Sequence, residues 1–191
     1  MKLSSIRRSS YVIWFGMVFF AVCWIAAALA DPSWEFGVAT MSELGISDTV
    51  AKYWFLAGCV GAGFCLTLYG ILEVSTTANK IHRYVYYILQ LAGILLVGVG
   101  VFTMDFGRMH SFFAVTFFLT MAIVMVVYAS YAVNEKRMFM SMFTWIILGI
   151  AVVLLAITPI ALVEPISVIL FAIWILSVDV LKYYRETIHH D

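Results

Sequence analysis

Residues 105–110 bring together three kinds of ionisable side chain, those of Asp105, Arg108 and His110. Arginine binds carboxylate or phosphate oxygens through paired hydrogen bonds. Histidine exchanges protons near neutral pH, and His110 stands at the start of a long apolar stretch. The three side chains therefore predict a binding or proton-transfer site. The alternative is that His110 only hydrogen-bonds a loop carbonyl or caps a helix.

A second polar segment lies just before the second apolar stretch. Thr40 and Glu43 in this segment have the spacing of a capping box, which predicts a short helix ending near Gly45. Trp34 and Phe36 are aromatic residues of the kind found at membrane surfaces, so we expect this helix to lie on the lipid interface.

If both polar segments face the same aqueous compartment, they form a pocket outside the cytoplasm. We expect the pocket to be lined by Ser42, Glu43, Asp105, Arg108 and His110. Arg108 would hold an anionic group and His110 would donate a hydrogen bond or a proton. Glu43 and Asp105 would orient Arg108 and His110. This hypothesis predicts binding of a lipid headgroup or a small amphipathic ligand.

The same residues leave catalysis open. Ser42 is a candidate nucleophile for a lipid hydrolase with His110 as its base. Ser111 is less suitable, because adjacent helical residues point about 100° apart. Zinc needs three or four ligands, and His110 is the only histidine expected on this side. No metal, haem or other cofactor is predicted.

Six long apolar stretches position these residues. Each has about the 20 residues that a helix needs to cross a bilayer. The chain is 64% hydrophobic and 12% charged. These features predict an all-α integral membrane protein with six helices in one bundle and a single domain over residues 1–191. The predicted spans cover about residues 11–30, 53–73, 84–103, 111–132, 141–163 and 166–184.

The basic residues fall mainly on one side of the predicted membrane. A cytoplasmic N-terminus leaves only Lys52 and Arg108 on the outer side. The positive-inside rule then places both termini of this multi-pass cell-membrane protein in the cytoplasm. The basic residues on the cytoplasmic side would be Lys2, Arg7, Arg8, Lys80, Arg83, Lys136, Arg137, Lys182 and Arg185.

Residues 1–30 also have the pattern of a secretory signal, with small residues before Asp31. Their apolar run is longer than that of a usual signal, so we expect an uncleaved first span. The formal net charge of zero predicts no nucleic-acid surface and leaves membrane lipids as the expected partners. A homo-oligomer stays open.

Glycines in the second and third spans predict that these helices pack closely. Thr158-Pro159 predicts a kink in the fifth span. At the cytoplasmic side, Asp179 and Lys182 lie one turn apart, which predicts an ion pair. If Asp179 and Glu73 instead face the bundle, they form a proton or ion site.

The segments MSELG (residues 41–45) and GVFTMD (residues 100–105), followed by His110, resemble the DUF998 family of prokaryotic membrane proteins. That family is distantly similar to the Frag1/DRAM/Sfk1 group, which is associated with lipid handling. The resemblance implies a membrane bundle but no established activity. It marks Ser42, Glu43 and Gly45 in the first segment, with Asp105 and His110 further on.

Two further functions stay open beside ligand binding. One is the lipid hydrolase, and the other is a proton-linked transporter of a small solute. Transport requires a polar route through the middle of the membrane. The polar side chains expected at that depth are only Thr67, Gln90, Thr116 and Thr120.

Overall fold

A computed structural model of the chain describes residues 3–188, with side-chain burial described for residues 8–182. Lys2 and the side chains of Arg7 and Arg185, all predicted to be cytoplasmic, lie outside these ranges. The described residues form no strand, which confirms the all-α prediction. The long helices are α1 (Leu3–Ala30), α2 (Ala51–Thr76), α3 (Lys80–Val101), α4 (Arg108–Asn134), α5 (Met138–Ile157) and α6 (Ile160–Ile188). Two short 3-10 helices are η1 (Met41–Ile46) and η2 (Met104–Phe106).

All six long helices are long and apolar enough to cross a membrane, which confirms the predicted number of spans. Their outward-facing side chains are large and apolar. Leu29, for example, is 80% exposed and Phe139 is 74% exposed. Such exposure would be unfavourable in water but suits a helix surrounded by lipid.

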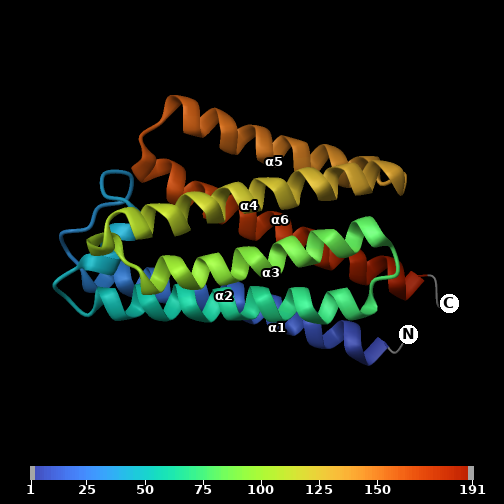
Figure 1. The fold of residues 1–191 in the computed structure, drawn as a ribbon, viewed down its shortest axis with the longest axis horizontal. Coiled ribbons are helices and arrows are strands. Elements are labelled where there is room, and N and C mark those ends of the chain that lie inside the picture. The colour runs from blue at the N-terminus through green and yellow to red at the C-terminus, as the bar shows by residue number, and fades with distance from the viewer. Residues whose placement is uncertain (1–2, 189–191) are drawn as a thin grey trace.

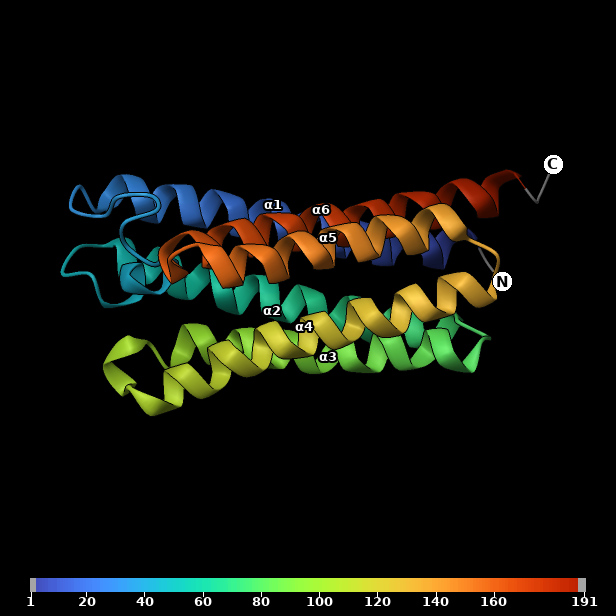
Figure 2. The same ribbon diagram turned by 90° about the horizontal axis from the view of Figure 1, so that it is seen from above.

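The six helices run roughly along one axis and form a ring (Figures 1 and 2). Each helix packs against its neighbours in sequence, and α6 returns to α1. Side chains fill the interior of the ring, and Leu66, Leu89 and Trp174 are almost completely buried there. Both ends of the chain lie at the same end of the bundle (Figure 1), which we call the terminal end. The opposite end, with residues 31–50 and 102–107, is the loop end.

Close packing of α2 against α3 confirms the prediction from their glycines. A Cβ atom added to Gly63 would lie 2.5 Å from the carbonyl oxygen of Gly93. One added to Gly93 would lie 2.3 Å from the Thr67 hydroxyl oxygen. Both distances are too short for a real contact, so the backbones approach as closely as glycine allows.

The predicted kink in the fifth span is wrong, because Thr158 and Pro159 separate two helices. Thr158 has extended dihedral angles (φ −125°, ψ 155°), which the following proline favours. Pro159 then precedes the first turn of α6 and its carbonyl accepts a hydrogen bond from Leu162 N–H (2.9 Å). Pro165, expected between spans, lies inside α6. The early start of α6 places Glu164 on this helix.

The capping box of η1 is confirmed, but the helix does not lie on the lipid surface as predicted. The Glu43 carboxylate accepts a hydrogen bond from the Thr40 N–H (2.8 Å). The opposite face of η1 is buried, and Leu44 is 0% exposed. A Cβ atom on Gly45 would lie only 2.8 Å from the Phe55 ring. Apolar burial thus draws η1 into the loop end of the ring, which it covers.

Candidate functional site

Ser42 belongs to the buried face of η1 and is 4% exposed. Its hydroxyl donates a hydrogen bond to Glu164 Oε1 at 2.6 Å, and its N–H is 3.4 Å from Glu164 Oε2. These contacts connect η1 to the first turns of α6. Glu164 was not among the predicted site residues. Its signal in the sequence is a carboxylate placed next to a proline inside an apolar stretch.

Asp105 and Arg108 are both exposed at the loop end. The Thr103 hydroxyl donates a short hydrogen bond to Asp105 Oδ1. No ion pair connects Asp105 to Arg108 among the described residues, where the one salt bridge lies at the terminal end. The hydroxyl at the start of η2 therefore satisfies the carboxylate that the sequence assigned to the pocket.

His110 is buried, with 7% of its surface exposed. Its Nδ1 atom lies 2.7 Å from the carbonyl oxygen of Phe102. This contact corresponds to the structural alternative for His110, a histidine that hydrogen-bonds a loop carbonyl. It joins the start of α4 to the end of α3, across the turn that contains η2.

The five predicted site residues make separate contacts. No hydrogen bond joins Ser42 to His110 in the described chain, and Glu43 bonds back to Thr40. The described residues also contain no group of three or more metal-ligating side chains. Glu43 lines a cavity beside residues 31–39, whereas Ser42 lines a separate, mostly apolar one.

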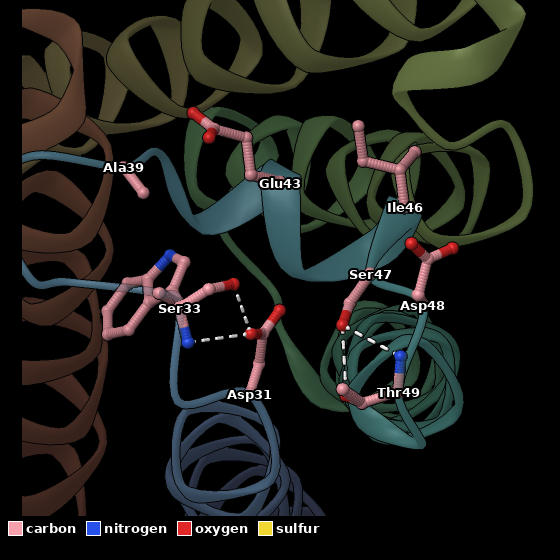
Figure 3. Close-up of a pocket in the computed structure, with 9 residues that line it drawn as sticks. Asp31, Ser33, Ala39, Glu43, Ile46, Ser47, Asp48 and Thr49 are labelled. Carbon is pink, nitrogen blue, oxygen red and sulfur yellow. Dashed lines mark hydrogen bonds between the residues drawn. The ribbon is translucent and has the colours of Figure 1, made fainter.

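A cavity of about 270 Å³ lies between residues 31–39 and η1 (Figure 3). Typical sites for drug-sized ligands have about 300–1,000 Å³, so this space suits a headgroup more than a whole lipid. It contains three acidic residues and no basic one. The lining residues are Asp31, Ser33, Trp34, Ala39, Glu43, Ile46, Ser47, Asp48 and Thr49.

Asp31 provides one of the carboxylates of this cavity, at the end of α1 (Figure 3). Its Oδ1 atom accepts hydrogen bonds from the Ser33 N–H (3.0 Å) and the Ser33 hydroxyl (2.5 Å). The hydroxyls of Ser33 and then Ser47 hold the pKa of Asp31 below its ordinary value of 3.8. Asp31 is therefore negatively charged at neutral pH.

Aromatic rings stand beside the cavity. Trp34 lines it, and its indole N–H donates to the Thr40 carbonyl at 2.8 Å. Trp24 and Phe36 pack against Trp34 at ring distances of 6.5 and 6.3 Å. Leu29, two residues before Asp31, is 80% exposed. Aromatic rings at the end of a membrane-spanning helix are typical of the headgroup region of a bilayer.

The family model described as "Protein of unknown function (DUF998)" matches residues 15–180, which is most of the chain. The chain belongs to the DUF998 family. Neither a curated protein nor a solved structure matches it. The region shared with DUF998 includes the acidic cavity, the Ser42–Glu164 contact and all six long helices in whole or in part. It begins at residue 15, inside α1.

The sequence prediction missed Asp31, Ser33 and Asp48 as lining residues. A signal was present, because Asp31-Pro32-Ser33 ends the first apolar stretch with a typical turn sequence. An aspartate two residues before a serine can accept its N–H and hydroxyl hydrogen bonds. What the sequence did not show is that η1 and residues 47–49 lie beside this turn (Figure 3).

Proposed function

We propose that this DUF998 protein binds the ammonium headgroup of a lipid, or of a similar amphiphile, in the cavity between residues 31–39 and η1. The observation that carries the proposal is the charge of the lining. Three carboxylates, those of Asp31, Glu43 and Asp48, stand without a lysine, arginine or histidine. Such a lining attracts a cation and repels a phosphate or sulfate.

The surroundings of Asp31 support the same ligand class. Its side chain is 8% exposed, so a charge that meets it is partly removed from water and the interaction is stronger than on an open surface. Trp34 also lines the cavity, and an indole ring is a favourable contact for an ammonium group. An acyl chain would extend along the lipid-facing side of α1, past Leu29.

This ligand differs from the anionic group first expected from Arg108. Arg108 lies at the start of α4, is exposed, and does not line the cavity. In the proposed arrangement the ammonium group enters the cavity and the phosphate of a zwitterionic lipid stays at its water-facing mouth.

Native mass spectrometry of the purified protein tests the proposal. The protein is released from mixed micelles that contain equal amounts of phosphatidylethanolamine and phosphatidylglycerol with the same acyl chains. We expect the wild-type protein to retain the ethanolamine lipid in preference. Asp31→Asn should lower that preference about tenfold, the equivalent of about 1.4 kcal/mol.

Asp105→Asn is the matched control, since Asp105 is an exposed loop-end carboxylate outside the cavity. Its preference should equal that of the wild type. Equal retention of the two lipids by the wild-type protein would contradict the proposal. An equal loss of preference in both variants would show that the effect comes from general surface charge.

A further inference from the structure

A second group of ionisable side chains is buried inside the ring near its terminal end. Glu73 on α2 is 1% exposed and Asp179 on α6 is 3% exposed. Both carboxylates therefore face the bundle. An ionised carboxylate in such a place needs hydrogen bonds and a compensating charge to be stable.

Lys182 compensates only one of these carboxylates. Its ammonium group forms a short ion pair with Glu73 and lies 5.6 Å above the ring of Tyr86. The predicted ion pair between Asp179 and Lys182 is wrong, although the two residues lie one turn apart on α6. The reason is that Glu73 projects from α2 toward Lys182, while Asp179 is turned toward α1.

Asp179 accepts three hydrogen bonds instead. The Ser10 hydroxyl (3.1 Å) and the Tyr69 hydroxyl (3.2 Å) both donate to its Oδ1 atom. The Trp14 indole N–H donates to Oδ2 at 3.2 Å. All three donors are uncharged, so they orient and solvate the carboxylate without neutralising it.

Among the side chains that the structure describes, no cation pairs with Asp179. The titratable groups that face Asp179 are Tyr69 and Glu73 on α2 and Tyr86 on α3. Lys182, the cation of its own helix, is engaged by Glu73. α5 carries no titratable side chain, and on α1 Arg8 is exposed. The bundle thus contains two buried carboxylates and one ammonium group, which pairs with Glu73.

Buried polar atoms next to this group also lack partners. The Tyr86 hydroxyl and His82 Nε2 have no hydrogen-bond partner among the described residues. Tyr86 is 2% exposed and its ring stands edge-on to Tyr69, 6.0 Å away. His82 lies against Tyr86 and forms no ion pair with either carboxylate. Direct hydrogen bonding is therefore incomplete around the two carboxylates.

We propose that Asp179 is a proton-binding site, and that the proton is held on its Oδ1 atom. A carboxylic acid must donate the hydrogen bond of its own O–H. Ser10 and Tyr69, which meet Oδ1, have hydroxyls that can reverse from donor to acceptor, whereas the indole N–H of Trp14 can only donate. Oδ2 therefore stays the carbonyl oxygen.

The proton comes from water at the terminal end, and Ser10, which is only half-buried, provides the access. An O–H bond forms at Oδ1, and the Ser10 or Tyr69 hydroxyl turns to accept it. The net charge of Glu73, Asp179 and Lys182 then changes from −1 to 0. Burial favours the neutral form of an unpaired carboxylate, so proton uptake relieves the excess charge.

Infrared difference spectroscopy of the reconstituted protein tests this site. Spectra are compared between about pH 8 and about pH 5, a range in which exposed carboxylates stay mostly ionised. The wild-type protein should gain the C=O stretch of a buried carboxylic acid, and this band should shift in deuterated water. Asp179→Asn should lose the band, while Asp105→Asn keeps it. A band that persists in Asp179→Asn, or no band in the wild type, overturns the proposal.

A second variant decides the question if Asp179→Asn does not fold. Trp14→Phe removes a donor that favours the ionised carboxylate, so the midpoint of the band should move to higher pH. Trp145→Phe is its control, because Trp145 lies exposed on α5. An unchanged midpoint in Trp14→Phe also overturns the proposal. This site and the ammonium cavity lie at opposite ends of the bundle, so each experiment can fail without the other.

Discussion

Hydroxyl groups hold the principal carboxylates of this protein at both ends. Ser42 donates to Glu164, and Ser33 donates to Asp31. At the terminal end Ser10 and Tyr69 donate to Asp179. A hydrogen bond to an ionised acceptor is stronger than one between neutral groups. The carboxylates of Glu164 and Asp179 therefore join distant segments of the chain without a basic partner, while that of Asp31 stabilises a local turn.

Ser42→Ala should destabilise the protein by about 1–3 kcal/mol, because a partly buried carboxylate loses its closest donor. The thermal unfolding midpoint in detergent, followed by circular dichroism, measures the effect. Ser111→Ala provides the comparison, since the exposed Ser111 hydroxyl bonds only to its own helix at Gly107. If Ser42→Ala and Ser111→Ala have the same unfolding midpoint, the Ser42–Glu164 contact adds little to stability.

The sequence predicted one local contact of this kind and missed the distant ones. The Thr40–Glu43 capping box follows from a spacing of three residues. Ser42 and Glu164 are separated by 122 positions, and their contact depends on where α6 begins. His110 contacts a carbonyl eight residues earlier, and the sequence left this possibility beside the binding role.

At the scale of helices, small residues determine which pairs approach closely. The α2–α3 pair is formed around Gly63 and Gly93. On α1, Gly16 faces Cys65 of α2, where an added Cβ would lie 2.5 Å from the cysteine Cβ. The helix pairs α1–α2 and α2–α3 thus form a tightly packed half of the ring.

Gly93→Ala should separate α2 from α3 and destabilise the protein by about 1–3 kcal/mol, as overpacking commonly does. Gly149→Ala on α5 is a matched change, because nothing lies within 4 Å of its added Cβ. Gly149→Ala should leave the free energy of unfolding unchanged or raise it by up to about 1 kcal/mol, because alanine favours the helical conformation. Thermal unfolding of both variants in one detergent makes the comparison. Equal midpoints would argue against glycine-dependent packing.

Span number was predictable because about 20 apolar residues are needed to cross lipid. The border between α5 and α6 could not be predicted in the same way. Apolar residues continue through it on both sides, and two prolines, Pro159 and Pro165, compete to mark it. Only Pro159 ends a helix, since Thr158 takes the extended conformation before it.

At the scale of the whole molecule, both chain ends share one face, while its orientation in the membrane stays a prediction from the basic residues. Lys80, Lys136 and Lys182 lie toward the terminal end, and Lys52 and Arg108 lie toward the loop end. The positive-inside rule therefore places the terminal end in the cytoplasm.

Cysteine labelling of intact cells tests this orientation. Asp48→Cys, at the exposed loop end, should react with a membrane-impermeant maleimide. Lys80→Cys should react only after lysis. The natural cysteines Cys23, Cys59 and Cys65 are 1%, 2% and 8% exposed, so they should give little background. Labelling of Lys80→Cys on intact cells would reverse the orientation and place the acidic cavity in the cytoplasm.

The ring order of the helices has a consequence for biosynthesis. Five of the six neighbouring pairs in the ring join consecutive helices, so each pair can form soon after its second member leaves the ribosome. The contact between α6 and α1 must wait for the last segment of the chain. The hydrogen bonds of Asp179 to Ser10 and Trp14 span this seam, at sequence separations of 169 and 165 residues. A nascent protein therefore keeps an open side until synthesis is nearly complete.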